Sequence, residues 1–451
     1  MHAHAIVIGG GVAGMLAAKV LTDHFERVTL LERDRLPAEP VFRPGTPQAC
    51  HLHLFWNHGL EIADGLFPGL KQNLIANGAP ELRMPRDALW LTSAGWRRRF
   101  DITGLISFSR SLLDWTLREH ALSTERIEIL EGAEVTGLTA SPSGHAVTGV
   151  NYRERGSGTR TLSADLVVDA GGHTSHAPEW LAELGRPLPH ETTIDPLLGY
   201  ASRYYAVPDG WHADWKALYI QADPPGSKRA GALFPQEGNR WICTLAGAGR
   251  DYPPISDEGF LEFAEGLRHP VLHDTIKNAE PLTPVKSFRR TANRWRHYER
   301  IRGWPQGFAS IGDATCTFNP LYGQGMTAAA LSVLELDRML RQARSTLWFQ
   351  KRLKRILAGA WLIATSEDRR YPTTLGPPVR THTKIMNAYV DRTVLTANDD
   401  PGVCGDLLDA LALKRRPACL LRPAVVTRIL ANQWKAPQNG GGEPGPMPRL
   451  L

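Results

Sequence analysis

The sequence predicts an α/β fold with a doubly wound parallel sheet, and observations near the N-terminus support this prediction. Residues 5–8 form a short apolar run rich in β-branched side chains, which is typical of a buried strand. Residues 12–21 follow with helical spacing and many alanines, and residues 27–31 form a second apolar run that ends at Glu32. Strand, helix and strand in this order make one βαβ unit, the opening of a doubly wound domain.

The elements that follow alternate in the same way. We expect a helix over 105–121 that is entered at Ser109, and several short strands over 127–169 separated by Ser-Gly turns. Residues 307–311 again predict a buried strand, and residues 324–340 again predict a helix. The first domain is therefore expected to resume late in the chain.

A change in amino-acid composition indicates a second domain. From about residue 186 to 285, aromatic and β-branched residues are interrupted by prolines, which favours a largely β second domain. We predict a discontinuous first domain, a mostly β substrate domain, a helical C-terminal region and a disordered tail, over the following ranges: 1–75, 100–185 and 286–345 for the first domain, 76–99 and 186–285 for the second, 346–435 for the helical region and 436–451 for the tail.

Composition excludes several classes of protein. The 451 residues contain no apolar run of 18, which argues against a membrane span, and the N-terminus lacks the pattern of a signal peptide. Five scattered cysteines without a CxxC pair argue against disulfides and zinc and favour the cytoplasm. The net charge of +6 (52 − 46) is too small to indicate nucleic-acid binding. The basic stretch 286–302 is either a solvated face or a dock for an anionic ligand or carrier. No particular oligomeric state is predicted.

A glycine motif lies between the first strand and the first helix. In Gly9-x-Gly11-x-x-Gly14, the first glycine permits a tight turn, the second lets backbone approach a diphosphate, and the third lets helix and strand pack closely. The diphosphate is then expected at the helix N-terminus, where the N–H groups of Val12 and Ala13 are free. Glu32 suits the ribose hydroxyls and would repel a 2′-phosphate, so that FAD or NAD is favoured over NADP. Arg33, the next residue, is also taken as a cofactor contact.

The same glycine pattern also occurs at residues 440–445, inside the proline-containing tail. No strand or helix is predicted around that match, so we interpret it as a coincidence. The context of the first match, a Rossmann-like βαβ unit, is what makes it informative.

A second glycine-rich turn follows the late strand. Asp313 ends that strand and suits hydrogen bonds to the ribityl hydroxyls of a flavin. The turn at 320–326 offers backbone N–H groups and a helix N-terminus to the negative pyrimidine edge of a reduced flavin. The alternative is an ordinary βα turn in which Asp313 caps the helix.

Three motifs together resemble the single-component FAD-dependent monooxygenases, which have the p-hydroxybenzoate hydroxylase fold. They are Gly9-x-Gly11-x-x-Gly14, Asp169-Ala-Gly-Gly172-x-x-Ser175 and Gly312-Asp313-Ala314 with Pro320-x-x-Gly-Gln-Gly325. Further stretches look like the branch that contains the polyene epoxidases of polyether biosynthesis: Arg43-Pro-Gly-x-Pro-Gln48-x-x-His51-x-His53, Leu66-Phe-Pro-Gly-Leu70 and Asn319-Pro-x-Tyr-Gly-Gln-Gly-Met-Thr327. The resemblance extends from residue 1 to about 430.

The resemblance implies roles for individual residues. Arg43 and Gln48 are expected near the flavin, and Arg110 at the phosphate or ribityl region of the cofactor. Asp169 and Gly171 belong to a motif linked to both FAD and NAD(P)H, but this chain has Gly171-Gly172 where many members have Asp-Gly, and His173 where the closer branch usually has arginine. The residues expected to line the isoalloxazine, and thus to act in catalysis, are Pro320, Gly323, Gln324, Gly325 and Met326.

The activity implied is insertion of one oxygen from O₂ into an apolar polyene, terpenoid, polyketide or aromatic substrate, free or carrier-bound, in secondary metabolism. Reduced FAD adds O₂ at C4a, and the resulting hydroperoxyflavin delivers its distal oxygen in an epoxidation or a hydroxylation, with NAD(P)H as the transient reductant. An alkene needs no base, and the sequence shows no convincing one. A redox-neutral cyclase with FAD as a scaffold is the alternative. A flavin halogenase is disfavoured because no W-x-W-x-I-P motif is present.

Two other features have ordinary explanations. His51 and His53 alternate, as metal ligands on a strand can, but no acidic or cysteine cluster accompanies them except Cys50, so that no metal is expected. The aromatic residues over 200–245 either wall an apolar substrate pocket or fill a core, and the sequence does not decide between these.

Overall fold

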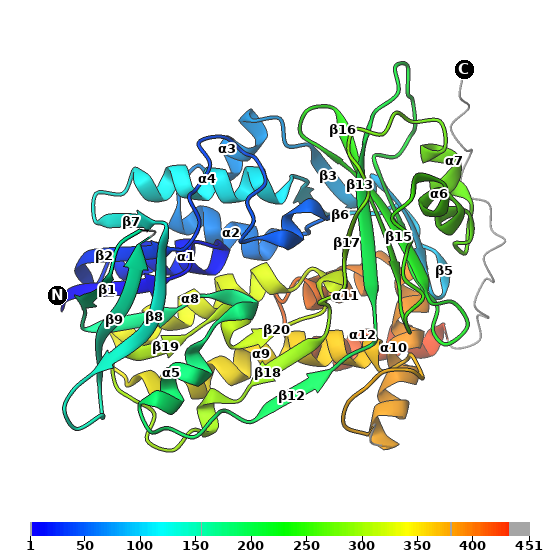
Figure 1. The fold of residues 1–451 in the computed structure, drawn as a ribbon. Helices are drawn as coiled ribbons and strands as arrows, with labels where there is room; N and C mark the ends of the chain where they lie inside the picture. The colour runs from blue at the N-terminus through cyan, green and yellow to red at the C-terminus, as the bar shows by residue number, and fades with distance from the viewer. Residues whose placement is uncertain (1, 155, 379–380, 433–451) are drawn as a thin grey trace.

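A five-stranded parallel sheet carries the first part of the fold (Figure 1). The computed structural model describes residues 2–154, 156–378 and 381–432. The strands lie in the order β19 (Phe308–Ser310), β11 (Leu166–Asp169), β1 (His2–Ile8), β2 (Phe25–Glu32) and β7 (Ile127–Glu131). Every neighbouring pair is parallel. The predicted α/β fold with a Rossmann-like sheet is confirmed.

The two faces of this sheet are covered differently. Ala5 and Val7 of β1 pack against helices, while Ile6 and Ile8 point to the opposite face, as the period of two requires. Helices α1 (Val12–Leu21), α2 (Asn57–Leu66), α3 (Leu70–Ala76), α4 (Arg110–Leu122), α8 (Gly325–Arg341) and α9 (Thr346–Asp368) contribute to the first core. On the other face lie α5 (Ala177–Glu183) and an antiparallel sheet of β8 (Ala133–Ala140), β9 (Val147–Glu154) and β10 (Thr159–Ser163).

A seven-stranded sheet forms the second part of the fold, at the right of Figure 1. Its order is β17 (Lys286–Phe288), β13 (Gly199–Ala206), β16 (Arg240–Gly247), β15 (Arg229–Gln236), β14 (Ala217–Ile220), β4 (Ala88–Thr92) and β5 (Gly95–Trp96). One face packs on α6 (Asp257–Glu265) and α7 (Val271–Ile276), two helices within a region expected to be largely β. The other face packs on α11 (Pro401–Leu411), α12 (Pro423–Ala431) and the end of α10 (Thr381–Asp399). The domain limits at single-residue precision stay a prediction.

Smaller elements connect these layers. Strands β3 (Glu81–Pro85) and β6 (Asp101–Ile106) pair with each other, and β12 (Glu191–Ile194), β18 (Asn293–Arg296) and β20 (Cys316–Thr317) form a three-stranded sheet. The short 3₁₀ turns are η1 (Pro47–Cys50), η2 (Gly172–Thr174), η3 (Tyr298–Arg300), η4 (Gly312–Ala314), η5 (Pro320–Tyr322) and η6 (Pro417–Leu421). No helix among the described residues is both long and apolar enough to cross a membrane. All five cysteines are free thiols.

Most predicted elements appear within a few residues of their expected limits. The helix α1 has the expected bounds, and β2 ends at Glu32 as predicted. Ser109 is the N-cap of α4, where its hydroxyl accepts a hydrogen bond from the Leu112 N–H at 3.1 Å. The helix expected from residue 105 is wrong in its first residues, because β6 extends to Ile106 and pairs with β3. The predicted tail 436–451 lies outside the described residues.

Candidate active site

The predicted motifs meet at one edge of the parallel sheet. Ile8 is paired with Leu31 and with Asp169, and Asp169 with Ser310, so that β1, β2, β11 and β19 end side by side. The loops that follow these four strands carry the two glycine-rich turns, Glu32 and the Asp169 motif. Ligands of open α/β sheets bind outside the carboxyl ends of the strands, where the strand order reverses. This edge is therefore the candidate active site.

The first turn has the geometry that its three glycines require. Gly9 has φ +97°, and a Cβ there would lie 2.7 Å from the carbonyl oxygen of Ala170. A Cβ at Gly14 would lie only 1.8 Å from the carbonyl oxygen of Gly9, so α1 packs directly on the turn. A Cβ at Gly11 would instead meet only the Arg110 guanidinium, at 3.9 Å. Gly11 is the N-cap of α1 and supplies no side chain, which leaves the N–H groups of Val12 and Ala13 open to an anion.

Glu32 lies beside this turn in a buried ionic cluster. Its Oε2 accepts a hydrogen bond from the Gly10 N–H at 2.7 Å and forms an ion pair with Arg43 at 3.1 Å. Arg43 also pairs with Asp34 at 3.2 Å and donates to the Gly10 carbonyl oxygen at 3.2 Å. Glu32 and Arg43 thus fix each other and the turn. The resemblance predicted only that Arg43 lies near the flavin. In the structure Arg43 lies at the Glu32 end of the candidate site.

A cleft of about 360 Å³, counted to its open mouth, adjoins this cluster. It lies between α1, α4 and the 36–46 segment, and its lining includes Gly10, Met15, Leu36, Arg43 and Trp115. Two further predicted cofactor contacts are Arg33 and Gln48. Arg33 is exposed after β2, and Gln48 is half-buried in η1.

Arg110 and Asp313 face the space between the two turns. The Nε of Arg110 pairs with Asp114 at 2.6 Å, and its Nη2 lies 3.9 Å from the position that a Cβ at Gly11 would take. The carboxylate of Asp313 accepts no hydrogen bond from any described residue. Burial raises its pKa to about 6, and the charges of Arg110 and Arg294 oppose this shift. The N-cap of α8 is Gln324, so nothing in the hydrogen bonding supports Asp313 as a helix cap. An unpartnered, half-buried acceptor suits the ribityl hydroxyls of a flavin.

We predict that Asp313→Ala weakens FAD binding by about 1.5–3 kcal/mol, the range for hydrogen bonds to a charged group. The dissociation constant would be measured by flavin fluorescence on reconstituted apoprotein. Asp313→Asn keeps one acceptor oxygen and should lie between the wild type and Asp313→Ala. An unchanged constant in Asp313→Ala would contradict the ribityl role.

The second turn ends at the N-terminus of α8. Gly323 has φ +64°, and a Cβ there would lie 3.0 Å from the Cβ of Leu54. Gln324 is buried and donates through Nε2 to the Leu411 carbonyl oxygen at 3.3 Å. Pro320 begins η5, and Gly325 and Met326 are the first residues of α8. A Cβ at Gly325 would meet only Oδ1 of Asp313, at 3.9 Å, so the turn and Asp313 border the same space.

A buried carboxylate that the sequence analysis missed holds this turn. Asp368, at the end of α9, accepts hydrogen bonds from the Tyr322 hydroxyl at 2.7 Å, from Asn319 at 2.8 Å and from Asn293 at 2.5 Å. It is fully buried, and burial raises its pKa to about 7 although these donors oppose the shift. Glu367, also near Tyr322, raises the pKa of Asp368 further. Asp368 lies far from the turn in sequence and belongs to no motif, so that only the fold identifies it.

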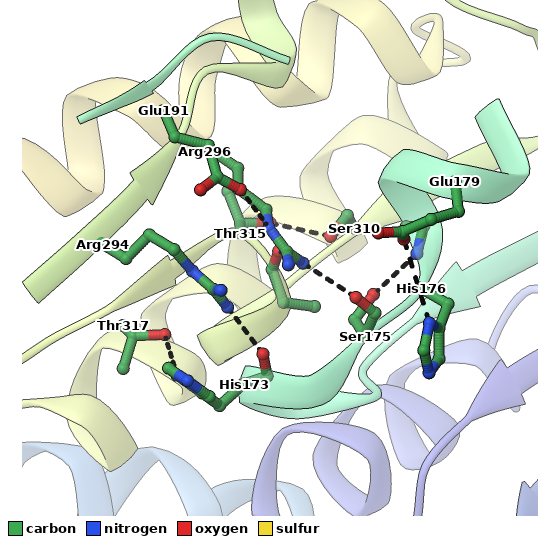
Figure 2. A network of polar contacts seen from close by, with 12 residues as sticks. His173, Ser175, His176, Glu179, Glu191, Arg294, Arg296, Ser310, Thr315 and Thr317 are labelled. Carbon is green, nitrogen blue, oxygen red and sulfur yellow. Dashed lines mark hydrogen bonds and ion pairs between the residues drawn. The ribbon is translucent and has the colours of Figure 1, made fainter. Parts of the chain in front are cut away.

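The Asp169 motif forms a network of internal contacts (Figure 2). One oxygen of Asp169 accepts from the Gly171 N–H at 2.9 Å, and the other accepts from the Ser175 hydroxyl at 2.6 Å. Arg294 donates to the carbonyl oxygen of His173 at 2.6 Å, from the side of β18. Asp169 and Gly171 therefore lie at the predicted edge, but the Asp169 carboxylate is satisfied by the protein and acts by fixing the loop.

His173 lies beside β20. Its Nδ1 lies 3.4 Å from the Thr317 hydroxyl. Burial, followed by the charges of Arg294 and Arg296, lowers its pKa to about 4, so the imidazole is neutral at pH 7. Arg296 itself pairs with Glu191 at 2.9 Å and donates to the Ser175 carbonyl oxygen at 3.1 Å. The basic stretch is thus partly buried and structural, while Arg290 remains exposed.

His51 and His53 lie in an irregular segment and bond in different directions. Nδ1 of His51 contacts the Ser202 hydroxyl at 2.8 Å, and Nδ1 of His53 contacts the His51 carbonyl oxygen at 3.0 Å. Burial, and then the charge of Arg110, lowers the pKa of His53 to about 3. His53 is therefore a neutral neighbour of the Arg110 site. Among the described residues, no group of three or more potential ligands is arranged for a metal.

Comparison with known proteins agrees with this geometry. A family model described as FAD binding domain matches residues 2–345. Protein Rv3254 of Mycobacterium tuberculosis is 34% identical over 355 residues, which cover 76% of this chain and 74% of that protein. Kynurenine 3-monooxygenase of Salinispora tropica is 24% identical over 360 residues, covering 74% and 72%.

Solved structures share the fold as well. The flavin-dependent brominase Bmp2 superposes with a TM-score of 0.68 over 96% of this chain and 99% of that chain. The identity of 15% shows a common fold and nothing more. The sequence relatives support the predicted resemblance to FAD-dependent monooxygenases, while the polyene epoxidase branch stays a prediction. This chain belongs to the FAD binding domain family.

Proposed function

We propose that the protein inserts one oxygen atom from O₂ into an apolar polyene, terpenoid, polyketide or aromatic substrate, with NAD(P)H as the transient reductant of its FAD. The observation that carries this proposal is the meeting of the unpartnered Asp313 carboxylate with the free N-terminus of α8. FAD, when bound, supplies the reduction and the activation of O₂. The residues Gly9, Gly11, Gly14, Glu32, Arg110 and Asp313 would hold it along the sheet edge.

The protein's own contribution is electrostatic. The N–H groups at the start of α8 point outward from a helix whose dipole favours negative charge at this end. They are fixed before any reaction, because Asp368 anchors Asn319 and Tyr322 at the start of the turn. Preorganised donors of this kind stabilise charge without reorganisation. This supports a role for Gly323 to Met326 beside the flavin ring.

The substrate is expected on the face of the seven-stranded sheet that looks toward α11. Tyr204 and Tyr219 are partly buried against the apolar cluster on that face, together with Leu54 next to Gly323. Tyr205 and Trp241 point to the other face and fill the core against α6 and α7. Alternation along the strands thus divides these aromatic residues between two faces, and we propose only Tyr204 and Tyr219 for the substrate side.

The Tyr322–Asp368 pair supplies a base that the sequence did not reveal. Asp368, with a pKa of about 7, can take up a proton near neutral pH through the Tyr322 hydroxyl that it binds. A phenol substrate would become more electron-rich by losing its proton, whereas an alkene would need no such base. The pair therefore supports hydroxylation of phenols alongside epoxidation.

Anaerobic reduction followed by O₂ tests the proposed function. NADPH should bleach the flavin absorbance of the holoenzyme, and O₂ should restore it. With a panel of polyenes and phenols in ¹⁸O₂, mass spectrometry should find one labelled oxygen in a product formed with equal consumption of NADPH and O₂. A product that is an isomer of its substrate, formed without either reagent, would instead establish the redox-neutral cyclase.

A further inference from the structure

Arg97 is a buried cation whose hydrogen-bonding capacity is mostly unused. It follows β5, is 5% exposed, and donates through Nε to Asn398 Oδ1 at 3.2 Å. Its guanidinium carbon lies 4.3 Å from the centre of the Trp90 ring. The Nη1 of Arg97 and the Nε1 of Trp90 are both buried without an acceptor. Two stacked side chains on the face of the sheet that looks toward α11 thus each have a buried donor without an acceptor.

Arg97 also differs from the other buried arginines that the structure describes. Four of these pair with a carboxylate: Arg43 with Glu32, Arg110 with Asp114, Arg203 with Asp257 and Arg296 with Glu191. For Arg97 no carboxylate partner occurs among the described residues, and nearby Asp399 pairs with Arg98 at 2.9 Å. Burial lowers the pKa of Arg97, yet an arginine stays charged in proteins. A buried charge normally has a counter-charge.

The surroundings of Arg97 connect it with the second turn. Trp90 belongs to an apolar cluster that also contains Trp56 and is bordered by Leu54 and Tyr219. Trp56 donates through Nε1 to the Tyr322 carbonyl oxygen at 3.4 Å, and Leu54 contacts Gly323. One apolar cluster thus extends from the proposed flavin side to the base of Arg97.

We propose that Arg97 binds a carboxylate at the end of an extended apolar substrate, remote from the carbon that reacts. The inference rests on the proposed function for the substrate side of the sheet. The planar fork of arginine matches a carboxylate with two parallel hydrogen bonds, and the stacked Trp90 has a further buried donor without an acceptor. The substrate class is then an apolar acid, and a wholly neutral hydrocarbon would leave Arg97 unpaired.

Binding of a matched probe pair tests this subsite without turnover. Calorimetric titration of the holoenzyme would compare 2-naphthoate with 2-naphthamide, which differ in charge and little in shape. We expect the acid to bind at least about tenfold more tightly, since charge-assisted pairs are the stronger ones, and Arg97→Met to remove the preference. Equal binding of both probes, or a preference that persists in Arg97→Met, would overturn the proposal.

Thermal melting separates a ligand-binding role from a structural one. Replacing an unpaired buried charge by an apolar side chain of similar length should leave the melting temperature unchanged or raise it. Arg203→Met is the matched control, because Arg203 is 6% exposed and also lies over a ring, that of Tyr205, but has a carboxylate partner. We expect only Arg203→Met to melt earlier. An equal fall in Arg97→Met would make Arg97 structural. Neither measurement depends on O₂ chemistry, so failure of the ¹⁸O₂ experiment would be distinguishable.

Discussion

Gly11→Val should give a folded protein without yellow colour. A Cβ at Gly11 meets only the Arg110 guanidinium, at 3.9 Å, so the protein itself has room for the new side chain. The branched side chain would instead stand before the N-terminus of α1, where the diphosphate needs bare backbone. Loss of even two charge-assisted hydrogen bonds corresponds to about 3 kcal/mol or more, and thus to a dissociation constant for FAD raised at least about 100-fold.

The measurement is the ratio of flavin absorbance to protein absorbance after purification, with circular dichroism to verify folding. Gly158→Val is the matched control, since a Cβ there meets no atom within 4 Å and the site lies in the β9–β10 connection, away from the sheet edge. It should remain yellow. Gly14→Ala would be a poor test, because its Cβ would collide with the Gly9 carbonyl oxygen. Full retention of FAD by folded Gly11→Val would refute the assignment of the turn.

Gly325→Val should keep its FAD and lose most of its oxygenating activity. The new side chain would project beside Asp313 at the start of α8, between the helix N-terminus and the flavin edge that the turn is proposed to face. It would keep the flavin edge away from the backbone N–H groups, and loss of one preorganised donor to developing charge costs about 10²–10³-fold in rate. We expect a loss of this size in the rate of product formation, with a change of less than about threefold in FAD affinity, which is under 1 kcal/mol.

Rapid mixing of the reduced enzyme with O₂, followed by product and peroxide analysis, would measure this loss. Reduced flavin in the variant should still react with O₂ but release peroxide in place of product. Gly65→Val in α2 introduces the same side chain on a helix where it meets no atom within 4 Å, and should behave as wild type. If Gly325→Val transfers oxygen normally, the turn does not face the ring.

Local patterns explain why much of the fold was predictable. The apolar run before Gly9 and the alanine-rich helix after it are signals of short range, and they appear with nearly the expected limits. The Ser109 cap marked the start of α4 correctly, whereas the strand 101–106 was missed because its partner, β3, is defined by tertiary pairing. The helices α6 and α7 were missed because aromatic content in the surrounding region favoured strands throughout.

Only those parts of the candidate site that belong to a sequence motif could be predicted. The roles proposed for Gly9, Gly11, Glu32 and Asp313 follow from their positions at or after the end of a strand, which the sequence shows. Asp368 has no such context, since it holds the second turn from the end of a helix that follows it in the chain. The unusual state of Arg97 was equally hidden, because the lack of a carboxylate partner is a property of the packed fold.

The strand order has a consequence for how the molecule is made. In the parallel sheet, residue 8 pairs with residue 169, and residue 169 pairs with residue 310. During synthesis the first glycine turn therefore leaves the ribosome long before the strand that places Asp313 beside it. Contacts between such distant segments pay loop-closure entropy and form slowly. Flavin uptake should thus be a late event in biogenesis, and a nascent chain that ends before residue 308 would lack half of the cradle. FAD, once bound, would then contact both the earliest and the later parts of the chain and stabilise their association.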